Sequence, residues 1–318
     1  MLFRLFLAAL LAACTPAYAQ GYPAKPIRFI TPYAPGGSTS ILARLVGQKL
    51  TESWGQSVIV DNRPGASTII GTEALAKASP DGYTILLVSV DCVLIPQLIR
   101  TSYDILKDFA PVATLGSSNF ILVVHPSVPA GNLQEFIALA RSRPGQLNYA
   151  SAGGGTVSHL VAELFDMMTG ISMQHVPYKG GGPALTDLVG GQVQLLFVPP
   201  ATTIPFVRGG RLKAMAVSGD ARIASLPQVP TFAEAGLPAY DPKQWYGVLA
   251  PAGTPRAIID KLSAEIGRIL AIPEIREKLD VVGMEPFVST PAQMAAMMKA
   301  DMARYGKVIK TANIRIEN

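Results

Sequence analysis

The sequence predicts an α/β protein built from two lobes, each with a parallel-rich sheet flanked by helices. Three observations support this class. Strand-like and helix-like segments alternate along most of the 318 residues. The strands are continuous apolar runs, as expected when helices cover both faces of a parallel sheet. The number of such units is also too large for one compact lobe.

The predicted alternation begins at residue 26. The segment "PIRFITPY" is a predicted strand, and a helix follows from Ser38 to about Leu50 because apolar residues recur there at helical spacing. The next strand is "QSVIVDN", and the turn "RPGAST" leads into a helix that ends near Ala78. Asp81 and Gly82 then form a turn before the strand "YTILLVSV".

From residue 110 the same pattern continues. Five further strands are predicted, namely "FILVVHP", "LNYAS", "MQHVP", "QVQLLFV" and "RLKAMAVS". Asn132 and Glu135 have the spacing of a capping box for the helix "LQEFIALARS". Two long helices are expected to begin at Thr254-Pro255 and Thr290-Pro291. We expect the methionines of the last helix to pack on the core as an apolar stripe: Met294, Met297, Met298 and Met302.

No low-complexity linker divides the chain, so we expect it to leave one lobe and return to it. The predicted division is residues 1–19 as a signal peptide, 20–115 with 235–318 as lobe 1, and 116–234 as lobe 2. We place the crossings near 110–124 and 228–250, where "APVATLGSSNFILVV" and "VPTFAEAGLPAY" have an irregular pattern.

The N-terminus predicts export to the periplasm. Arg4 precedes an apolar run that is too short to span a membrane, as in a secretory signal. Ala17-Tyr18-Ala19 fits ordinary cleavage and soluble release, which we favour, while "LAAC" at Cys14 fits lipid anchoring. The other cysteine, Cys92, is expected to be a small buried hydrophobic residue.

Three turns between a strand and a helix share one composition. The segments "TPYAPGGSTSILARL" (31–45), "LNYASAGGGTVSHLVAEL" (147–164) and "MQHVPYKGGGPALTDLV" (173–189) each place Gly-rich turns before a helix. The first amides of a helix have no intrahelical acceptor and favour an anion, and glycine lets the anion approach the backbone. Because ligands bind at the carboxyl ends of parallel strands, the three loops together predict an anion clamp.

A small carboxylate fits this clamp better than a nucleotide. The first loop continues from Gly37 into Ser38-Thr39 with no Lys for a phosphate chain, and it has no G-x-G-x-x-G pattern. A net charge of +5 without basic clusters also argues against nucleic acid.

We expect no metal, cofactor or catalytic set. His125, His159 and His175 lack metal-ligand spacing, and no G-x-S-x-G elbow occurs. We interpret His125 and His175 as structural. For His159, contact with ligand and packing both remain open, as do ligand attraction and plain solvation for Lys179.

The chain resembles the Bug-type periplasmic solute receptors of tripartite tricarboxylate transporters. The resemblance covers essentially the whole mature chain, through segments that include "YPAKPIRFITPYAPGGSTSILAR", "VDNRPGAS", "SPDGYTILL", "YASAGGGTVSHL", "VPYKGGGPALTDLVGGQV" and "WYGVLAPAGTP". It implies a periplasmic-binding-protein fold of type II-like character, with a ligand cleft at the hinge. It also implies a carboxylated ligand held by backbone groups and waters, and lobe closure that presents the loaded receptor to membrane partners.

Carried over by position, the resemblance implies a set of ligand-binding residues in the three loops. The first loop contributes Tyr33, Ala34, Gly36, Gly37, Ser38, Thr39 and Ser40. The second contributes Ser151, Ala152, Gly153, Gly154, Thr156 and His159, and the third contributes Tyr178.

Two positions depart from the family pattern. The family commonly has Asp where this chain has Ser40, and loss of that carboxylate predicts an amine-free acid: a dicarboxylate, a hydroxy acid or an aromatic acid. The segment "SVDC" (89–92) replaces a small Ser/Gly/Thr-rich turn, so Asp91 is an alternative source of the missing charge.

Three functions are weighed for this sequence. The leading one is a binding protein, expected to be monomeric, that takes up a small organic acid with membrane transporter subunits. An exported enzyme that uses the same cleft is the main rival, and it lacks a nucleophile–base pair in the loops. A receptor that loads a sensor-kinase ectodomain is the third, and lobe closure serves it equally well.

Overall fold

The structure, a computed structural model, describes residues 21–281 and 283–311. The predicted signal peptide, Cys14 and both cleavage sites therefore lie outside the described residues. Within the described part of the chain, no helix combines the length and the apolar character needed to cross a bilayer.

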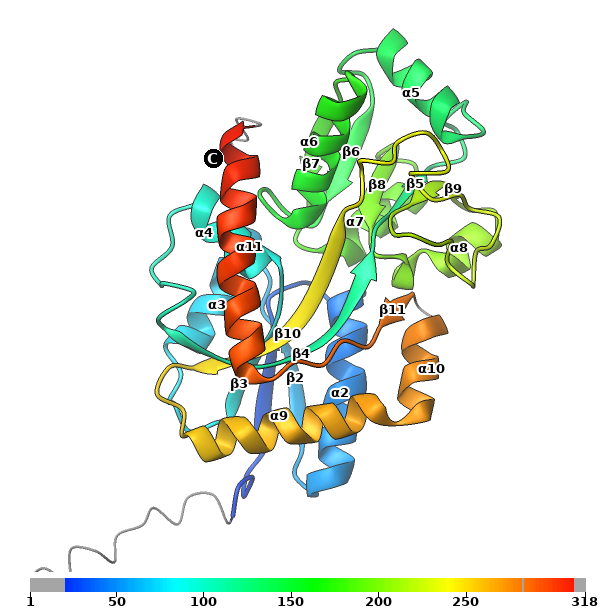
Figure 1. Ribbon diagram of the computed structural model, residues 1–318. Coiled ribbons are helices and arrows are strands. Elements are labelled where there is room, and N and C mark those ends of the chain that lie inside the picture. The colour runs from blue at the N-terminus through cyan, green and yellow to red at the C-terminus, as the bar shows by residue number, and fades with distance from the viewer. Residues whose placement is uncertain (1–20, 282, 312–318) are drawn as a thin grey trace, which may run out of the picture.

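Two mixed sheets form the framework, as Figure 1 shows. The first has the spatial order β11-β4-β10-β3-β1-β2, with bounds β1 Ile27–Thr31, β2 Val58–Asn62, β3 Thr84–Ser89, β4 Phe109–Asn119, β10 Lys243–Pro251 and β11 Met284–Glu285. The second has the order β7-β6-β8-β5-β9, with bounds β5 Ile121–Val124, β6 Asn148–Ser151, β7 Gln174–Pro177, β8 Leu195–Val198 and β9 Lys213–Val217. We call the first sheet with its helices lobe 1 and the second lobe 2.

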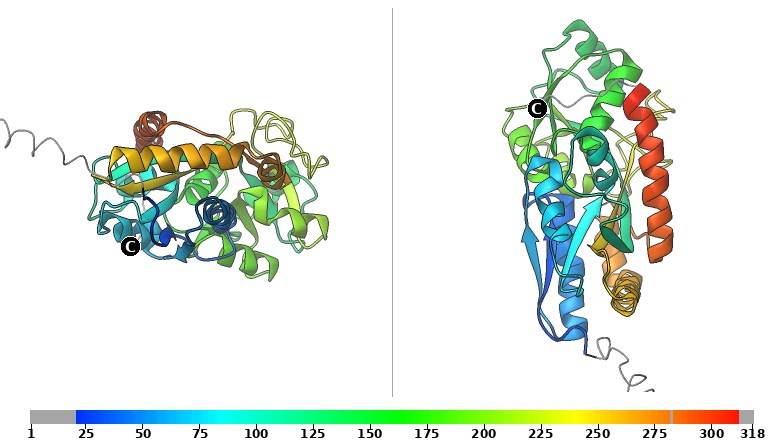
Figure 2. Two further views of the ribbon diagram at one scale, coloured as in Figure 1. Left: turned by 90° about the horizontal axis from the view of Figure 1, so that it is seen from below. Right: turned by 90° about the vertical axis from the view of Figure 1, so that its left-hand side faces the viewer.

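Helices flank each sheet, and the α/β class is therefore confirmed. Lobe 1 carries α2 (Ser38–Trp54), a short 3₁₀ turn (Ala66–Thr68), α3 (Ile69–Ala76), α4 (Asp91–Leu98), α9 (Arg256–Ala271), α10 (Pro273–Val281) and α11 (Pro291–Thr311). Lobe 2 carries α5 (Leu133–Ser142), α6 (Val157–Thr169), α7 (Gly181–Val189), a 3₁₀ turn (Pro200–Thr202) and α8 (Ile204–Arg208). The two views of Figure 2 show α9 lying across the base of lobe 1 and α11 along its side.

Strand direction distinguishes the strands that end in the Gly-rich loops from the strands that join the lobes. β1 pairs in parallel with β2 and β3, and β6 pairs in parallel with β7 and β8. The strands that join the lobes run antiparallel to these neighbours: β10 to β3 and β4, and β5 to β8 and β9. The carboxyl ends of β1, β6 and β7 therefore lead into the three Gly-rich loops.

The first crossing segment is more regular than the sequence indicates, whereas the second is irregular over residues 228–242, as expected, before β10 begins at Lys243. We expected irregular chain near 110–124, but β4 is a strand whose backbone pairs with β10 along one edge and with β11 along the other, with two register shifts in the pairing with β10. The chain passes from sheet to sheet around Phe120, whose amide donates to Ser218 Oγ at 2.8 Å, and Ser218 in turn donates to Pro242 O. The division into lobes at residues 115 and 235 stays a prediction.

Several local predictions are confirmed. Asn132 Oδ1 accepts from the Glu135 amide at 2.9 Å, and Glu135 Oε2 accepts from the Gly131 amide, which completes the predicted cap of α5. Met294 and Met298 of α11 are buried in the core, with Met297 and Met302 packed against it. Cys92 is a buried free thiol. The helices α4 and α10 are absent from the sequence prediction, since each is short and α4 contains Pro96.

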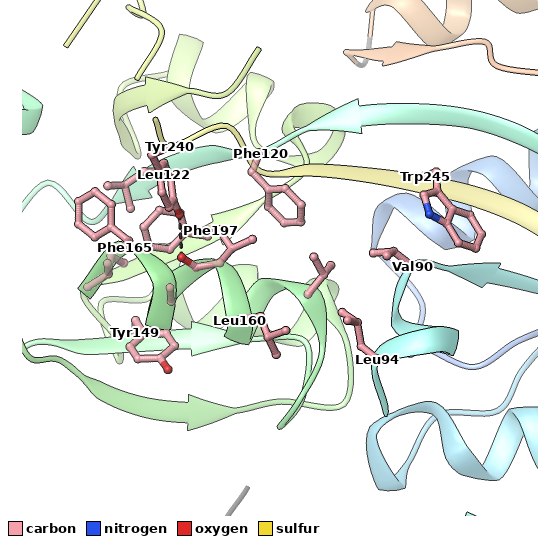
Figure 3. Packing of buried hydrophobic residues seen from close by; sticks show 14 of the residues in the cluster. Val90, Leu94, Phe120, Leu122, Tyr149, Leu160, Phe165, Phe197, Tyr240 and Trp245 are labelled. Carbon is pink, nitrogen blue, oxygen red and sulfur yellow. Dashed lines mark hydrogen bonds between the residues drawn. The ribbon is translucent and has the colours of Figure 1, made fainter. Parts of the chain in front are cut away.

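One hydrophobic cluster runs through both lobes. Figure 3 shows Val90, Leu94 and Trp245 on the lobe 1 side, and Leu160 and Phe197 on the lobe 2 side. At its centre in lobe 2, the Phe165 ring contacts the rings of Phe136, Phe197, Phe232 and Tyr240. The continuous packing holds the loops at the lobe boundary close together.

Candidate functional site

The first and third Gly-rich loops lie against each other across the lobe boundary. The Ala34 amide donates to Lys179 O at 3.0 Å, which links the loop after β1 to the loop after β7. The backbones are so close that a Cβ placed on Gly182 would lie 2.4 Å from Pro35 O. Glycine at residue 182 is therefore required by this approach of one lobe to the other.

A cavity of about 50 Å³ lies between the lobes beside these loops. Of the predicted ligand-binding residues, five line it: Tyr33, Gly37, Ser38, Thr39 and Ala152. Val157 and Ser158, the first residues of α6, also line it. The predicted residues outside this lining are Ala34, Gly36, Ser40, Ser151, Gly153, Gly154, Thr156, His159 and Tyr178.

The wall opposite the loops comes from residues that the sequence analysis did not single out. Gly181 of the third loop and Asp91 also line the cavity, and this wall is formed by Phe120, the segment 196–199, Gln244 and Tyr246. They belong to the chain crossing, to the end of β8 and to β10. The wall is largely apolar, and its position depends on long-range pairing of β4, β5, β8 and β10, which no local motif encodes.

Donors without partners gather at the N-terminus of α2. Ser38 and Thr39 are its first two residues, so their amides have no acceptor within the helix. The Ser38 and Tyr246 hydroxyls are buried and lie near each other, and neither oxygen makes a hydrogen bond of good geometry among the described residues. Buried polar groups of this kind cost free energy unless they are paired, so this end of the cavity suits a hydrogen-bonding anion.

The other end of the cavity holds the carboxylate of Asp91. Asp91 is 3% exposed and begins α4 in lobe 1. Its Oδ1 accepts from the Val157 amide of lobe 2 at 2.5 Å, and its Oδ2 accepts from the hydroxyls of Tyr33 and Ser89. Burial raises the pKa of Asp91, and these hydrogen bonds only partly offset that effect. The carboxylate thus satisfies the first amide of α6 from across the lobe boundary.

Ser40 lies behind the first loop and away from the cavity. Asn62 Nδ2 donates to Ser40 Oγ at 3.1 Å and to Tyr33 O at 2.8 Å, which fixes the loop from its outer side. Charge at the cavity therefore depends on Asp91 in this chain, whatever the family pattern at residue 40. Asp91 is the one charged residue of the lining, all of which lies in the described chain, so it stays the alternative source of the charge that residue 40 lacks.

His159 packs behind the second loop. Its Nδ1 accepts from the Gly155 amide at 3.0 Å, and its ring stacks on His175 with centroids 3.9 Å apart. His175 Nε2 is 2.6 Å from Ser151 Oγ, and burial lowers the pKa of His175 to about 4. The histidine pair is placed to shape the loop, and packing is the reading of His159 that this geometry favours.

The third loop contributes backbone more than side chains. Tyr178 donates its hydroxyl to Asp187 Oδ2 at 2.7 Å, and the Lys179 side chain is exposed while its carbonyl binds the first loop. Across the described ranges, no group of three or more His, Cys, Asp or Glu residues has the arrangement of a metal site.

Two lobes joined by crossing strands, with a cavity between them, define the fold of periplasmic solute-binding proteins. Solved structures agree with this class. The R. palustris protein Rpa4515, solved with adipate, is 36% identical over 92% of this chain and 99% of its own, with a TM-score of 0.89. MatC from Rhodopseudomonas palustris, solved with bound malate, is 31% identical over 91% of this chain and 100% of its own, with a TM-score of 0.86.

The family follows from the sequence match. Residues 42–314 match the family described as tripartite tricarboxylate transporter family receptor. Protein BugT of Bordetella pertussis is 36% identical over 308 residues, which cover 95% of this chain and 94% of BugT. The chain belongs to this family of receptors, and the resemblance that its motifs indicated is confirmed.

Proposed function

We propose that this protein is an extracytoplasmic receptor that captures a small carboxylated organic acid between its two lobes for a tripartite tricarboxylate-type transporter. The observation that carries the proposal is the N-terminus of α2. There, unpaired helix amides and two buried, unpartnered hydroxyls face one cavity. The relatives solved with adipate and with malate support a carboxylate as the ligand.

In this proposal the ligand carboxylate accepts hydrogen bonds from the backbone amides of Ser38 and Thr39. It also accepts from the hydroxyls of Ser38 and Tyr246. The helix N-terminus adds a favourable field for the negative charge. Tyr33, Gly37 and Ala152 shape the cavity around it, and the other predicted loop residues hold the three turns in place. Transfer of the bound acid to the membrane subunits requires the lobes to open. The crossing strands at Phe120 and Pro242 are the natural hinge for this motion.

A pair of tyrosine variants tests the role of the cavity. Tyr246→Phe removes a hydroxyl that has no partner within the described chain, so thermal stability should stay the same or rise. Affinity for the acid should fall about 10-fold or more, since a hydrogen bond to a charged group is lost. Tyr240→Phe is the matched control, because its hydroxyl donates to Val161 O at 2.8 Å away from the cavity. That variant should lose about 1 kcal/mol of stability and keep its affinity.

The ligand screen uses thermal shift and calorimetry on a panel of small acids, with native mass spectrometry to find any acid that co-purifies. A receptor gains stability from an acid that it returns unchanged, whereas an enzyme converts it. Stabilisation by none of the acids, or equal affinity in Tyr246→Phe and the natural protein, contradicts the proposal. Uptake and gene induction measured in a deletion strain separate transport from loading of a sensor kinase.

A further inference from the structure

We propose that Asp91 takes the place of a second ligand carboxylate, so that this receptor selects small acids with a single carboxylate over diacids. The inference rests on the proposed function and deepens it, because it names the ligand class of the same cavity. It concerns the position where "SVDC" departs from the family pattern.

The geometry gives the first argument. Two helices present their N-termini to the cavity, α2 from lobe 1 and α6 from lobe 2. The first amide of α6, at Val157, already donates to Asp91 Oδ1 at 2.5 Å. A ligand carboxylate aimed at this amide has to displace a carboxylate of the protein that two further hydroxyls hold in place. The α2 end, with the unpartnered hydroxyls of Ser38 and Tyr246, stays open to an anion.

The charge balance gives the second argument. The residues that line the cavity all lie in the described part of the chain, and they include no Lys, Arg or His. Asp91 is therefore a negative charge without a cation beside the ligand. One ligand carboxylate at the N-terminus of α2 has its own donors, but a second one aimed at the Val157 amide has to take the place of the Asp91 carboxylate and meets a like charge in a buried site. We expect this repulsion to weaken a diacid at least 10-fold relative to the matched monoacid.

The remaining surface suits such a ligand. Opposite the loops, Phe120, Leu196 and Val198 offer an apolar wall to the body of the acid, which has no second carboxylate to desolvate. The α2 donors thus match the carboxylate of a monoacid and the apolar wall matches its body, while Asp91 excludes a second carboxylate.

The test compares matched acids on the full chain and on Asp91 variants. Butyrate is paired with succinate and hexanoate with adipate, and each dissociation constant is measured by calorimetry. The natural protein should bind the monoacid of a pair at least 10-fold more tightly than the diacid. In Asp91→Asn, which keeps the size and an acceptor for the Val157 amide, the diacid should gain at least 10-fold and the preference should disappear.

Controls make each outcome decisive. Asp187→Asn removes another carboxylate that accepts from a tyrosine hydroxyl, at a position outside the cavity, and it should leave the preference unchanged. Thermal unfolding checks the fold of each variant, and Asp91→Ser repeats the test if Asp91→Asn is unstable. Equal binding of monoacid and diacid by the natural protein, or an unchanged preference in both Asp91 variants, overturns this inference alone. Failure of every acid to bind any of the proteins overturns the proposed function and this inference with it.

Discussion

Replacing Gly182 by alanine should block closure of the lobes without harming either of them. The added Cβ would lie 2.4 Å from Pro35 O, whereas ordinary contacts of this kind begin near 3.4 Å, so the loops have to move apart by about 1 Å. A shift of that size breaks the 3.0 Å hydrogen bond from the Ala34 amide to Lys179 O. The lost bond and the overpacking together cost the closed form about 1–3 kcal/mol, which lowers ligand affinity about 5–150-fold.

Lobe 2 itself should tolerate the change. Residue 182 lies in α7, its φ is not in the left-handed region, and the crowded atoms all belong to lobe 1. Calorimetry gives the affinity, thermal unfolding the stability, and small-angle scattering with saturating acid the degree of closure. Gly190→Ala, at the other end of α7, is the matched control, because its Cβ meets only ordinary contacts at 3.4 Å and beyond. If Gly182→Ala binds the acid as tightly as Gly190→Ala does, the lobes do not close along this contact and the reasoning fails.

Three further predictions concern the first loop, a buried acid and the core. Gly37→Val should lose acid binding, because residue 37 lines the cavity and its added Cβ would lie 3.6 Å from Gly182 N, so the valine methyl groups press the first and third loops apart; an unchanged affinity in calorimetry would refute this. Burial raises the pKa of Asp166 from 3.8 to about 7, so the folded protein holds a proton that the unfolded chain loses, and stability falls as pH rises from 4 to 7. Asp166→Asn should therefore raise the free energy of unfolding by about 2 kcal/mol at pH 7.5 and leave it unchanged at pH 4. The figure is half of the value for a fully buried group, because the side chain is only half-buried. Denaturant titrations at both pH values measure the two free energies. Phe165→Ala should cost about 3–5 kcal/mol of unfolding free energy, with a smaller loss at the exposed Phe287 as the control.

Sequence reasoning located the loops because their signal is local. A strand that ends in glycine and hydroxyl residues before an apolar helical repeat can be read in one short window, and Gly37, Ser38 and Thr39 do line the cavity. The capping pair Asn132 and Glu135 was predictable for the same reason, since both partners lie within one turn.

The rest of the cavity depends on contacts that no short window contains. Tyr246 reaches the cavity because β10 pairs with β4, more than 120 residues away in the sequence. Asp91 was visible as a departure from the family pattern, but its meeting with Val157 requires both lobes to be in place. Ser40 shows the converse, because its loop was located correctly while Asn62 from the next strand holds its hydroxyl away from the cavity.

Closure and selectivity can be separated by measuring ratios. Gly182→Ala acts on the contact between the first and third loops, outside the cavity lining at Asp91, so it should weaken monoacids and diacids by the same factor. Asp91→Asn keeps an acceptor for the Val157 amide, so its loss of charge is the change that distinguishes one acid from the other. The ratio of the two dissociation constants should therefore change in Asp91→Asn and stay constant in Gly182→Ala. A ratio that changes in Gly182→Ala would mean that the alanine reshapes the cavity, and the assignment of this contact to closure would then be wrong.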